Sequence, residues 1–184
     1  MPGIIGVVAD IIKTPREYET AIETALGQSI QNIITEDEKT AKDLIAFLKA
    51  NKYGRATFLP LTNIRSSNTL HNHGVLNEKG VIGVASGLVE ADGKFHELIE
   101  YLLGRIVVID NIDNAAFIAR KYNYTLRLVT LEGELLSPGG SISGGAYKNT
   151  ANLLGRRREI QALEDLIKKL DEQIAGLSSD KEKE

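Results

Sequence analysis

The chain has 184 residues, of which 42% are hydrophobic and 26% are charged, an ordinary composition for a globular protein with a sizeable core. It has no cysteine, which excludes disulfides and thiolate metal sites, and its net charge of −3 excludes an overall basic field for nucleic acid. No apolar run reaches the roughly 18–20 residues of a membrane span. No signal peptide precedes the first strand-like run, and three scattered histidines predict no zinc site, so we expect a cytoplasmic protein, or a piece of one, without a cofactor.

The first third of the chain alternates between strand-like and helical patterns. Thr14 resembles a helix N-cap, Gly27 a helix end, and Pro60 a strand end. The expected elements are a strand at 4–9, a helix at 15–26, a strand at 30–34, a helix that follows Thr35 or Asp37, and a strand at 55–59. This pattern indicates an α/β lobe over residues 1–62.

A polar, turn-rich stretch at 63–80 predicts a connection between two lobes. The expected elements beyond it are an apolar run at 81–89, a helix at 95–103, a strand at 106–109, an alanine-bearing helix and a strand-like run at 125–136. They indicate a second α/β lobe over residues 81–155.

The two lobes resemble each other in sequence. Residues 22–27 and 99–104 are similar, and each run is followed by an apolar strand, an acidic helix start and a helix with alanines on its core face. Two later matches extend the series: the pair Lys52-Tyr53 with Lys121-Tyr122, and Arg55 with Arg127. Any two helix–glycine–strand–helix units share some of this, but the matching order favours an internal duplication. The predicted fold class is therefore α+β, with two pseudo-symmetric α/β lobes.

After Gly155 the pattern changes to that of a coiled coil, and we assign residues 156–184 to a coiled-coil stub. Its apolar residues follow heptad spacing, namely Ile160, Leu163, Ile167, Leu170, Ile174 and Leu177. An isolated helix of this length is marginal in water and needs a partner. The simplest expectation is that the chain is a fragment whose antiparallel partner helix precedes Met1 in a parent protein; alternatively, the helix packs on its own domain.

Four glycines lie within residues 138–145, and three interpretations are open. A phosphate cradle has little support, because neither the P-loop nor the dinucleotide spacing is present. A flexible loop is possible, although Ile142 and the strand-like run before it connect the segment to the core. A seam between subunits is favoured, because bare backbone can pair with a partner's strand edge.

The run from Leu131 to Gly145 resembles the glycine signature of the hinge domain of SMC (structural maintenance of chromosomes) proteins. Residues 6–10, 18–27 and 54–61 resemble other hallmark runs of that hinge, so the resemblance extends over essentially the whole chain and is greatest to bacterial, homodimeric SMC. It implies a two-lobed hinge that forms a closed homodimer, with the glycine-bearing lobe against the other lobe of the partner. It places these residues at the seam: Gly139, Gly140, Ser141, Gly144 and Gly145. It also implies that the ATPase heads of the parent protein lie elsewhere.

The only triple-basic run is Arg156-Arg157-Arg158, at the junction with the coiled coil. The resemblance implies non-specific DNA binding near this junction, and arginine–phosphate contacts give such affinity. A solvated basic turn at the start of the helix is the competing interpretation. An enzyme is disfavoured, because the paired acids lie where caps and turns are expected and no nucleophile elbow occurs. Two hypotheses remain: a DNA-contacting homodimerisation hinge of a chromosome condensation and segregation ATPase, located at the nucleoid, or a module that only dimerises.

Overall fold

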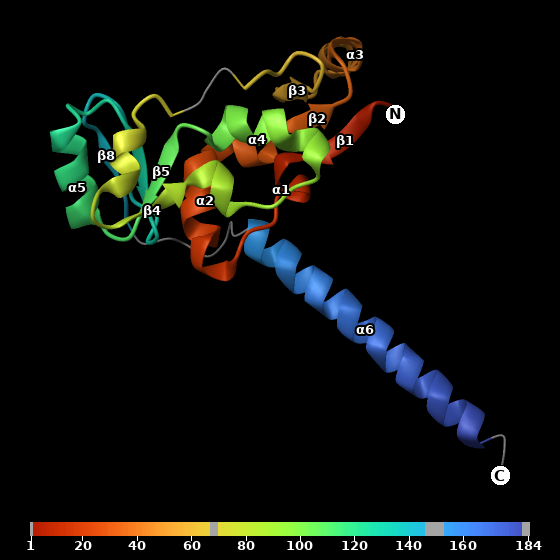
Figure 1. The fold of residues 1–184 in the computed structure, drawn as a ribbon. Coiled ribbons are helices and arrows are strands. Elements are labelled where there is room, and N and C mark those ends of the chain that lie inside the picture. The colour runs from red at the N-terminus through yellow and green to blue at the C-terminus, as the bar shows by residue number, and fades with distance from the viewer. Residues whose placement is uncertain (1, 67–69, 146–152, 182–184) are drawn as a thin grey trace.

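The computed structural model describes residues 2–66, 70–145 and 153–181. They form an elongated body of two neighbouring lobes from which one long helix projects (Figure 1). Each lobe has a β-sheet of its own, and helices α2 (Glu19–Leu26) and α4 (His96–Leu103) pack together where the lobes meet. The α+β architecture with two lobes and a terminal helix, predicted from the sequence, is confirmed.

The first lobe contains a three-stranded sheet in the order β1-β2-β3. Strand β1 is antiparallel to β2, and β2 is parallel to β3. Its elements are β1 (Ile4–Val7), α1 (Val8–Ile11), α2, β2 (Ile33–Thr35), α3 (Glu38–Ala50) and β3 (Phe58–Pro60), with 3-10 helices at Arg16–Tyr18 and Gly27–Gln31. Pro60 is tolerated within β3 because this strand lies at the edge of the sheet.

The second lobe contains a five-stranded sheet in the order β4-β5-β6-β7-β8. Its first three strands repeat the antiparallel-then-parallel pairing of the first lobe, and β7 and β8 add a hairpin beside β6. Its elements are β4 (Val81–Val84), α4, β5 (Ile106–Ile109), α5 (Ile112–Lys121), β6 (Arg127–Thr130), β7 (Leu135–Leu136) and β8 (Ile142–Ser143), with 3-10 helices at His73–Asn77, Ala85–Leu88 and Gly93–Phe95.

The internal duplication extends to local hydrogen bonds. The carbonyl of Gly3 in one lobe and that of Gly80 in the other each accept a backbone N–H just after the middle strand, at 2.9 and 2.8 Å. The helices that follow are capped alike, because the side chains of Asp37 and Asn111 each accept a backbone N–H three residues on. The strand order and these shared contacts confirm the duplication.

The residue pairing within the duplication differs from the predicted one. Lys52 and Asn123 are the equivalent residues, because each follows a helix C-cap with a positive φ, of 53° and 54°. Lys121 instead lies inside the shorter helix α5. Likewise, Arg127 begins β6, whereas Arg55 precedes β3 and has no strand position. The predicted matches of Lys52-Tyr53 with Lys121-Tyr122 and of Arg55 with Arg127 are therefore wrong.

Several element boundaries also differ from expectation. The first strand ends at Val7, and the strand expected at 30–34 is shifted to Ile33–Thr35 by a 3-10 helix. Thr14 caps no helix; its hydroxyl donates to the carbonyl of Leu88, in the other lobe, at 2.8 Å. A tertiary hydrogen bond has replaced the local one that the sequence suggested.

A hydrophobic core spans the two lobes, with buried side chains from α2 and α4 among those of β2, β5 and β6. A second core lies within the second lobe, under α5, and includes Leu70 and Val75. The stretch at 70–80 therefore packs onto the second lobe by burying two apolar side chains. The boundaries at residues 62, 80 and 155 remain predictions.

Glu78 connects the stretch at 70–80 to the C-terminal end of α5 by hydrogen bonds. Its Oε1 accepts hydrogen bonds from Lys121 Nζ at 2.7 Å and from the Tyr122 hydroxyl at 2.9 Å. These bonds, that from Lys121 first, hold the pKa of Glu78 below its ordinary value of 4.5. Because the pKa is lower in the folded protein than in the unfolded chain, this contribution to stability is present above pH 4.5 and is lost as the pH falls through the folded-state pKa.

We therefore expect Glu78→Gln to make stability less dependent on pH. Urea unfolding at neutral pH and below pH 4.5 should show a smaller loss on acidification than in the unsubstituted protein. Glu132→Gln, at an exposed glutamate, serves as the control. An acid response of Glu78→Gln equal to that of the unsubstituted protein would contradict the assignment.

Candidate functional site

The glycine-rich edge, defined here as residues 138–145, is an exposed hairpin end. Gly140 donates its N–H to the carbonyl of Ser137 at 3.0 Å, with Pro138 and Gly139 at the centre of the turn. Gly139 has a φ of +90°, the value that a type II turn requires at this position and that glycine adopts without strain. Residues 137–140 therefore form an ordered turn between the strands β7 and β8.

Strand β8 lies at the outer end of the five-stranded sheet, beyond β7. The backbone carbonyl of Ser141 accepts the N–H of Ser137 at 3.0 Å. Ile142, the next residue, is opposite Leu136 in the β7–β8 pair. Because hydrogen bonding alternates along an antiparallel pair, Ile142 turns its N–H and C=O away from β7, toward the open edge. Its side chain is 61% exposed. Within the described residues no further strand covers this edge.

The glycines differ in what surrounds them. At Gly139 and Gly145 an added Cβ would meet no atom within 4 Å, so open space lies beside them. A Cβ added at Gly140 would lie 3.5 Å from the ring of Tyr124, and one added at Gly144 would lie 2.9 Å from Glu134 Cγ. Gly144 thus permits the close approach of β8 to the turn before β7, while Gly139 and Gly145 leave bare backbone at the surface.

Two of the acidic residues that lie at turns and helix starts, Glu134 and Asp110, have structural roles. Glu134 accepts the hydroxyl of Thr130 and donates its own N–H to that hydroxyl at 3.1 Å, which closes the turn between β6 and β7. Both carboxylate oxygens of Asp110 accept from the side-chain amide nitrogen of Asn114, Oδ1 at 2.8 Å and Oδ2 at 3.0 Å. In the described part of the chain, no group of three or more potential ligands is placed to hold a metal ion, and no helix is long and apolar enough to cross a bilayer.

The basic triplet lies in the first turns of helix α6 (Leu153–Lys181). Arg156 is exposed, and the side chain of Arg157 lies outside the described part of the structure. Arg158 pairs with Glu19 of α2, with 2.7 Å between Arg158 Nε and Glu19 Oε1. This bond raises the pKa of the Arg158 guanidinium. The sequence did not predict this structural role for Arg158.

Two buried glutamates of α2 hold the start of α6. Glu19 and Glu23 are 4% and 5% exposed and lie one helical turn apart. Glu23 accepts the backbone N–H of Leu154 at 2.7 Å, while Glu19 binds Arg158. Acceptors suit this position, because the first N–H groups of a helix have no partner within it and its N-terminus carries partial positive charge. We call these contacts, with the 5% exposed side chain of Leu154, the arm root.

Sequence reasoning missed Glu19 and Glu23. The available signal was the repeat Glu19-Thr20-Ala21-Ile22 and Glu23-Thr24-Ala25-Leu26, which places both acids on one face of a helix of mostly small and apolar residues. In the structure this face contacts a distant helix, because Glu23 binds Leu154, which lies 131 positions further along the chain. Nothing in the sequence indicates this contact.

Beyond the arm root, α6 leaves the body (Figure 1). Its heptad residues are exposed there. The exposed fractions are 51% for Ile160, 59% for Leu163, 58% for Ile167, 47% for Leu170 and 61% for Ile174. The alternative that this stripe packs on its own domain is therefore wrong for these five residues; the side chain of Leu177 lies outside the described part.

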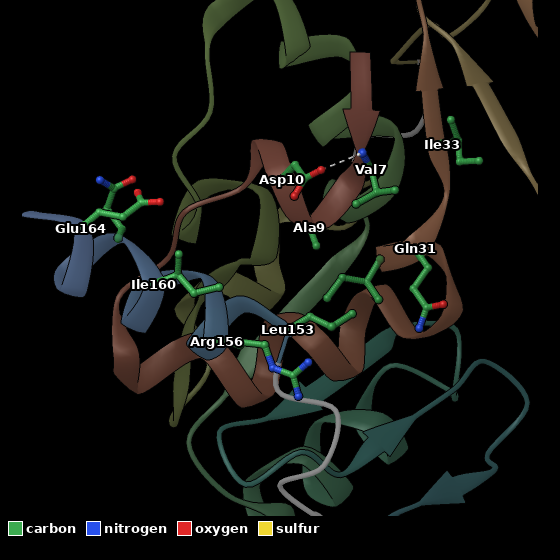
Figure 2. A pocket seen from close by; sticks show the side chains of 11 residues that line it. Val7, Ala9, Asp10, Gln31, Ile33, Leu153, Arg156, Ile160 and Glu164 are labelled. Atoms are coloured by element: carbon green, nitrogen blue, oxygen red, sulfur yellow. Dashed lines mark hydrogen bonds between the residues drawn. The ribbon is translucent and has the colours of Figure 1, made fainter. Parts of the chain in front are cut away.

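A groove of about 770 Å³ runs between α6 and the first lobe. Figure 2 shows Ile160 and Arg156 on α6, with Ala9, Gln31 and Ile33 of the first lobe among the other lining residues. The groove joins the apolar stripe of α6 to apolar side chains of the body.

Comparisons with known proteins agree with this architecture. Residues 1–119 match the family described as the SMC proteins Flexible Hinge Domain. Over 96% of its length the chain is 40% identical to Chromosome partition protein Smc of Clostridium kluyveri, and over 97% it is 40% identical to that of Bacillus subtilis. The chain spans only 16% and 15% of the lengths of these relatives.

Two solved structures are similar in fold and sequence. The SMC hinge domain of Geobacillus stearothermophilus, crystallised as an asymmetric dimer, has a TM-score of 0.82 and 40% identity, covering 96% of this chain and 72% of that one. The Smc hinge domain of Pyrococcus furiosus with an extended coiled coil has a TM-score of 0.67 and 32% identity, covering 97% and 66%. The family match, the relatives and the two-lobed fold together establish that this chain belongs to the SMC hinge-domain family.

Proposed function

We propose that the chain is the homodimerisation hinge of a chromosome-partition SMC protein, which links two coiled-coil arms. The observation that carries the proposal is the open edge of β8, where Ile142 is 61% exposed within the glycine-rich edge. An unpaired strand edge is a template for pairing with another chain. The dimer of the related G. stearothermophilus hinge supports the same assignment.

In this proposal Gly139, Gly140, Ser141, Gly144 and Gly145 lie at the seam between subunits. All five are exposed in the single chain, and they flank β8 on either side along the chain. The family resemblance puts this seam against the first lobe of the partner. That lobe has free strand edges at β1 and β3, because β2 occupies the centre of its sheet. A closed dimer would then contain two equivalent seams.

The arm of the parent protein would form on α6. The exposed heptad stripe and the adjoining groove present apolar side chains from Ile160 onward that need a covering helix. We propose that this helix is antiparallel to α6 and precedes Met1 in the parent protein. ATP-binding heads, chromosome condensation and segregation, and a cytoplasmic, nucleoid-associated location belong to that parent protein in this proposal.

Sedimentation velocity tests the dimer directly. We expect a homodimer at micromolar concentration, and its dissociation should require disruption of β8 pairing. A monomer at all accessible concentrations would overturn the proposal.

We further propose that the junction of body and arm contacts DNA without sequence preference, through Arg156 and Arg157. Arg156 is exposed at the first turn of α6, and arginine binds phosphate oxygens through its several N–H groups. Arg158 was part of the same predicted site; its bond to Glu19 supports a mainly structural role beside it. The alternative function is a module that dimerises and has no direct DNA contact.

Reversal of one charge separates these alternatives. We expect Arg156→Glu to weaken binding to duplex DNA. The plot of log association constant against log salt concentration should become less steep, by about 0.9 for each phosphate that the protein no longer neutralises. Arg158 is kept as arginine in this test, because Arg158→Glu would place a second negative charge beside the buried Glu19 at the arm root. Arg120→Glu, at an exposed arginine of α5, is the matched control. A weak response that is equal for both variants would favour the dimerisation-only module.

A further inference from the structure

Acidic side chains border the exposed apolar stripe of α6 on both sides. The stripe residues from Ile160 to Ile174 take heptad positions a and d, so positions e and g flank the stripe. Glu164 and Asp171 occupy e, and Glu159 occupies g; all three are exposed. We call these three residues the acidic flanks.

The basic residues of the same segment lie elsewhere on the helix. Between 159 and 174 the cations are Lys168 and Lys169, at positions b and c, away from the stripe. The remaining flanking positions hold Leu166 and Gln173, which are uncharged. Among the described residues the acidic flanks make no salt bridge. The border of the stripe is therefore negative over about three helical turns.

The groove between α6 and the first lobe extends this border toward the body. Glu164 and Ile160 both line the groove, opposite Gln31 and Ile33 of the first lobe (Figure 2). The one cation of α6 that lines it is Arg156, one helical turn nearer the body than Ile160. A helix that lies on the stripe at this point would contact apolar side chains and the Glu164 carboxylate together.

These charges disfavour a second copy of α6 as the covering helix. In a parallel pair, position g of one helix faces position e of the other, which brings Glu159 against Glu164. In an antiparallel pair, position e faces position e, so that carboxylates again meet carboxylates. Like charges at such paired positions repel and weaken the association, whereas opposite charges strengthen it.

We propose that the acidic flanks select the helix that pairs with α6. The selected helix has apolar heptad residues and carries lysine or arginine at its own flanking positions; a second α6 is rejected. The inference rests on the proposed arm and adds the chemistry that chooses its occupant. The same repulsion keeps the α6 helices of two dimerised chains from pairing through their apolar stripes.

Three fluorescein-labelled peptides and the full chain test this selection by fluorescence anisotropy. Two are designed helices of about four heptads with leucine at a and d, and with either lysine or glutamate at e and g. The third has the sequence of residues 153–181. We expect the lysine-flanked peptide to bind at least about tenfold more tightly than the other two. This difference should shrink at about 1 M salt, where screening acts within about 3 Å.

Two double variants tell selection at the flanks from general attraction to an acidic helix. Glu164→Lys with Asp171→Lys should remove the preference for the lysine-flanked peptide. Asp165→Lys with Glu172→Lys is the matched control, because it makes the same change of charge one position further along, at position f opposite the stripe. The control should keep the preference of the unsubstituted chain.

The outcomes separate this inference from the proposed function. If the lysine-flanked and glutamate-flanked peptides bind equally, or if the two double variants behave alike, the acidic flanks do not select the partner, although the stripe remains the surface of the arm. If the peptide of residues 153–181 binds as tightly as the lysine-flanked one, a second copy is the occupant and the inference is overturned. If no peptide binds, the arm on α6 and the inference fail together, while sedimentation velocity still decides on the homodimer. A chain that is monomeric but prefers the lysine-flanked peptide supports the inference and overturns the dimer.

Discussion

Replacing Ile142 with proline is expected to convert the homodimer into a folded monomer. The N–H of Ile142 points to the open edge, because Ser141 and Ser143 supply the bonds to β7. Proline therefore removes a donor from the seam and places its ring at the pairing edge, while the hairpin bonds remain. An edge strand tolerates this residue, as β3 does with Pro60.

The expected loss can be estimated for two equivalent seams. An unsatisfied backbone group at a buried seam costs about 1–3 kcal/mol, so two seams lose about 2–6 kcal/mol. This weakens dimerisation at least about thirtyfold. Sedimentation velocity measures the loss, and circular dichroism verifies the fold.

Ile142→Val is the matched control, because valine keeps the N–H and the β-branched side chain. It should remain a dimer. If Ile142→Pro is still a dimer with the affinity of Ile142→Val, then the free edge of β8 is not the seam. The glycine residues are less suitable for this test, because substitution at Gly139, with its φ of +90°, would also strain the turn.

Replacing Leu154 with alanine is expected to lower the free energy of unfolding by about 2–5 kcal/mol. Leu154 is 5% exposed and packs in the core shared by the two lobes, although it belongs to the helix that leaves the body. Its truncation would leave a cavity at the arm root, beside Glu23. Urea denaturation, with the slope compared between variants, measures the change.

The control comes from the same helix. Leu163 is 59% exposed, so Leu163→Ala should change the unfolding free energy of this chain by less than about 0.5 kcal/mol. Equal effects of the two substitutions would mean that the arm root does not stabilise the body. If Leu154→Ala destabilises the chain and Leu163→Ala does not, then contacts with α2, and not a flexible joint, set the direction in which α6 leaves the body.

Much of the architecture could be predicted from the sequence because it depends on local patterns. The order of strands and helices, the duplication and the heptad stripe all follow from apolar periodicity and glycine positions that each segment carries by itself. The family resemblance rested on the glycine signature and on the run from Gly54 to Leu61, which are also local. The predicted helix start at Thr14 was wrong because its hydroxyl makes a tertiary hydrogen bond to the carbonyl of Leu88 in place of a local capping bond.

The sequence by itself determined the two-lobed fold, the glycine-rich edge and the coiled-coil character of the terminal helix. Only the tertiary structure decided which charges remain free. Arg158, one of three arginines in a basic run, pairs with the buried Glu19 far away in the chain, whereas Arg105 and Arg127 have no acidic partner among the described residues. The physical reason is that an ion pair depends on the distance between two groups in space. The positions of residues along the chain do not reveal that α6 packs against α2.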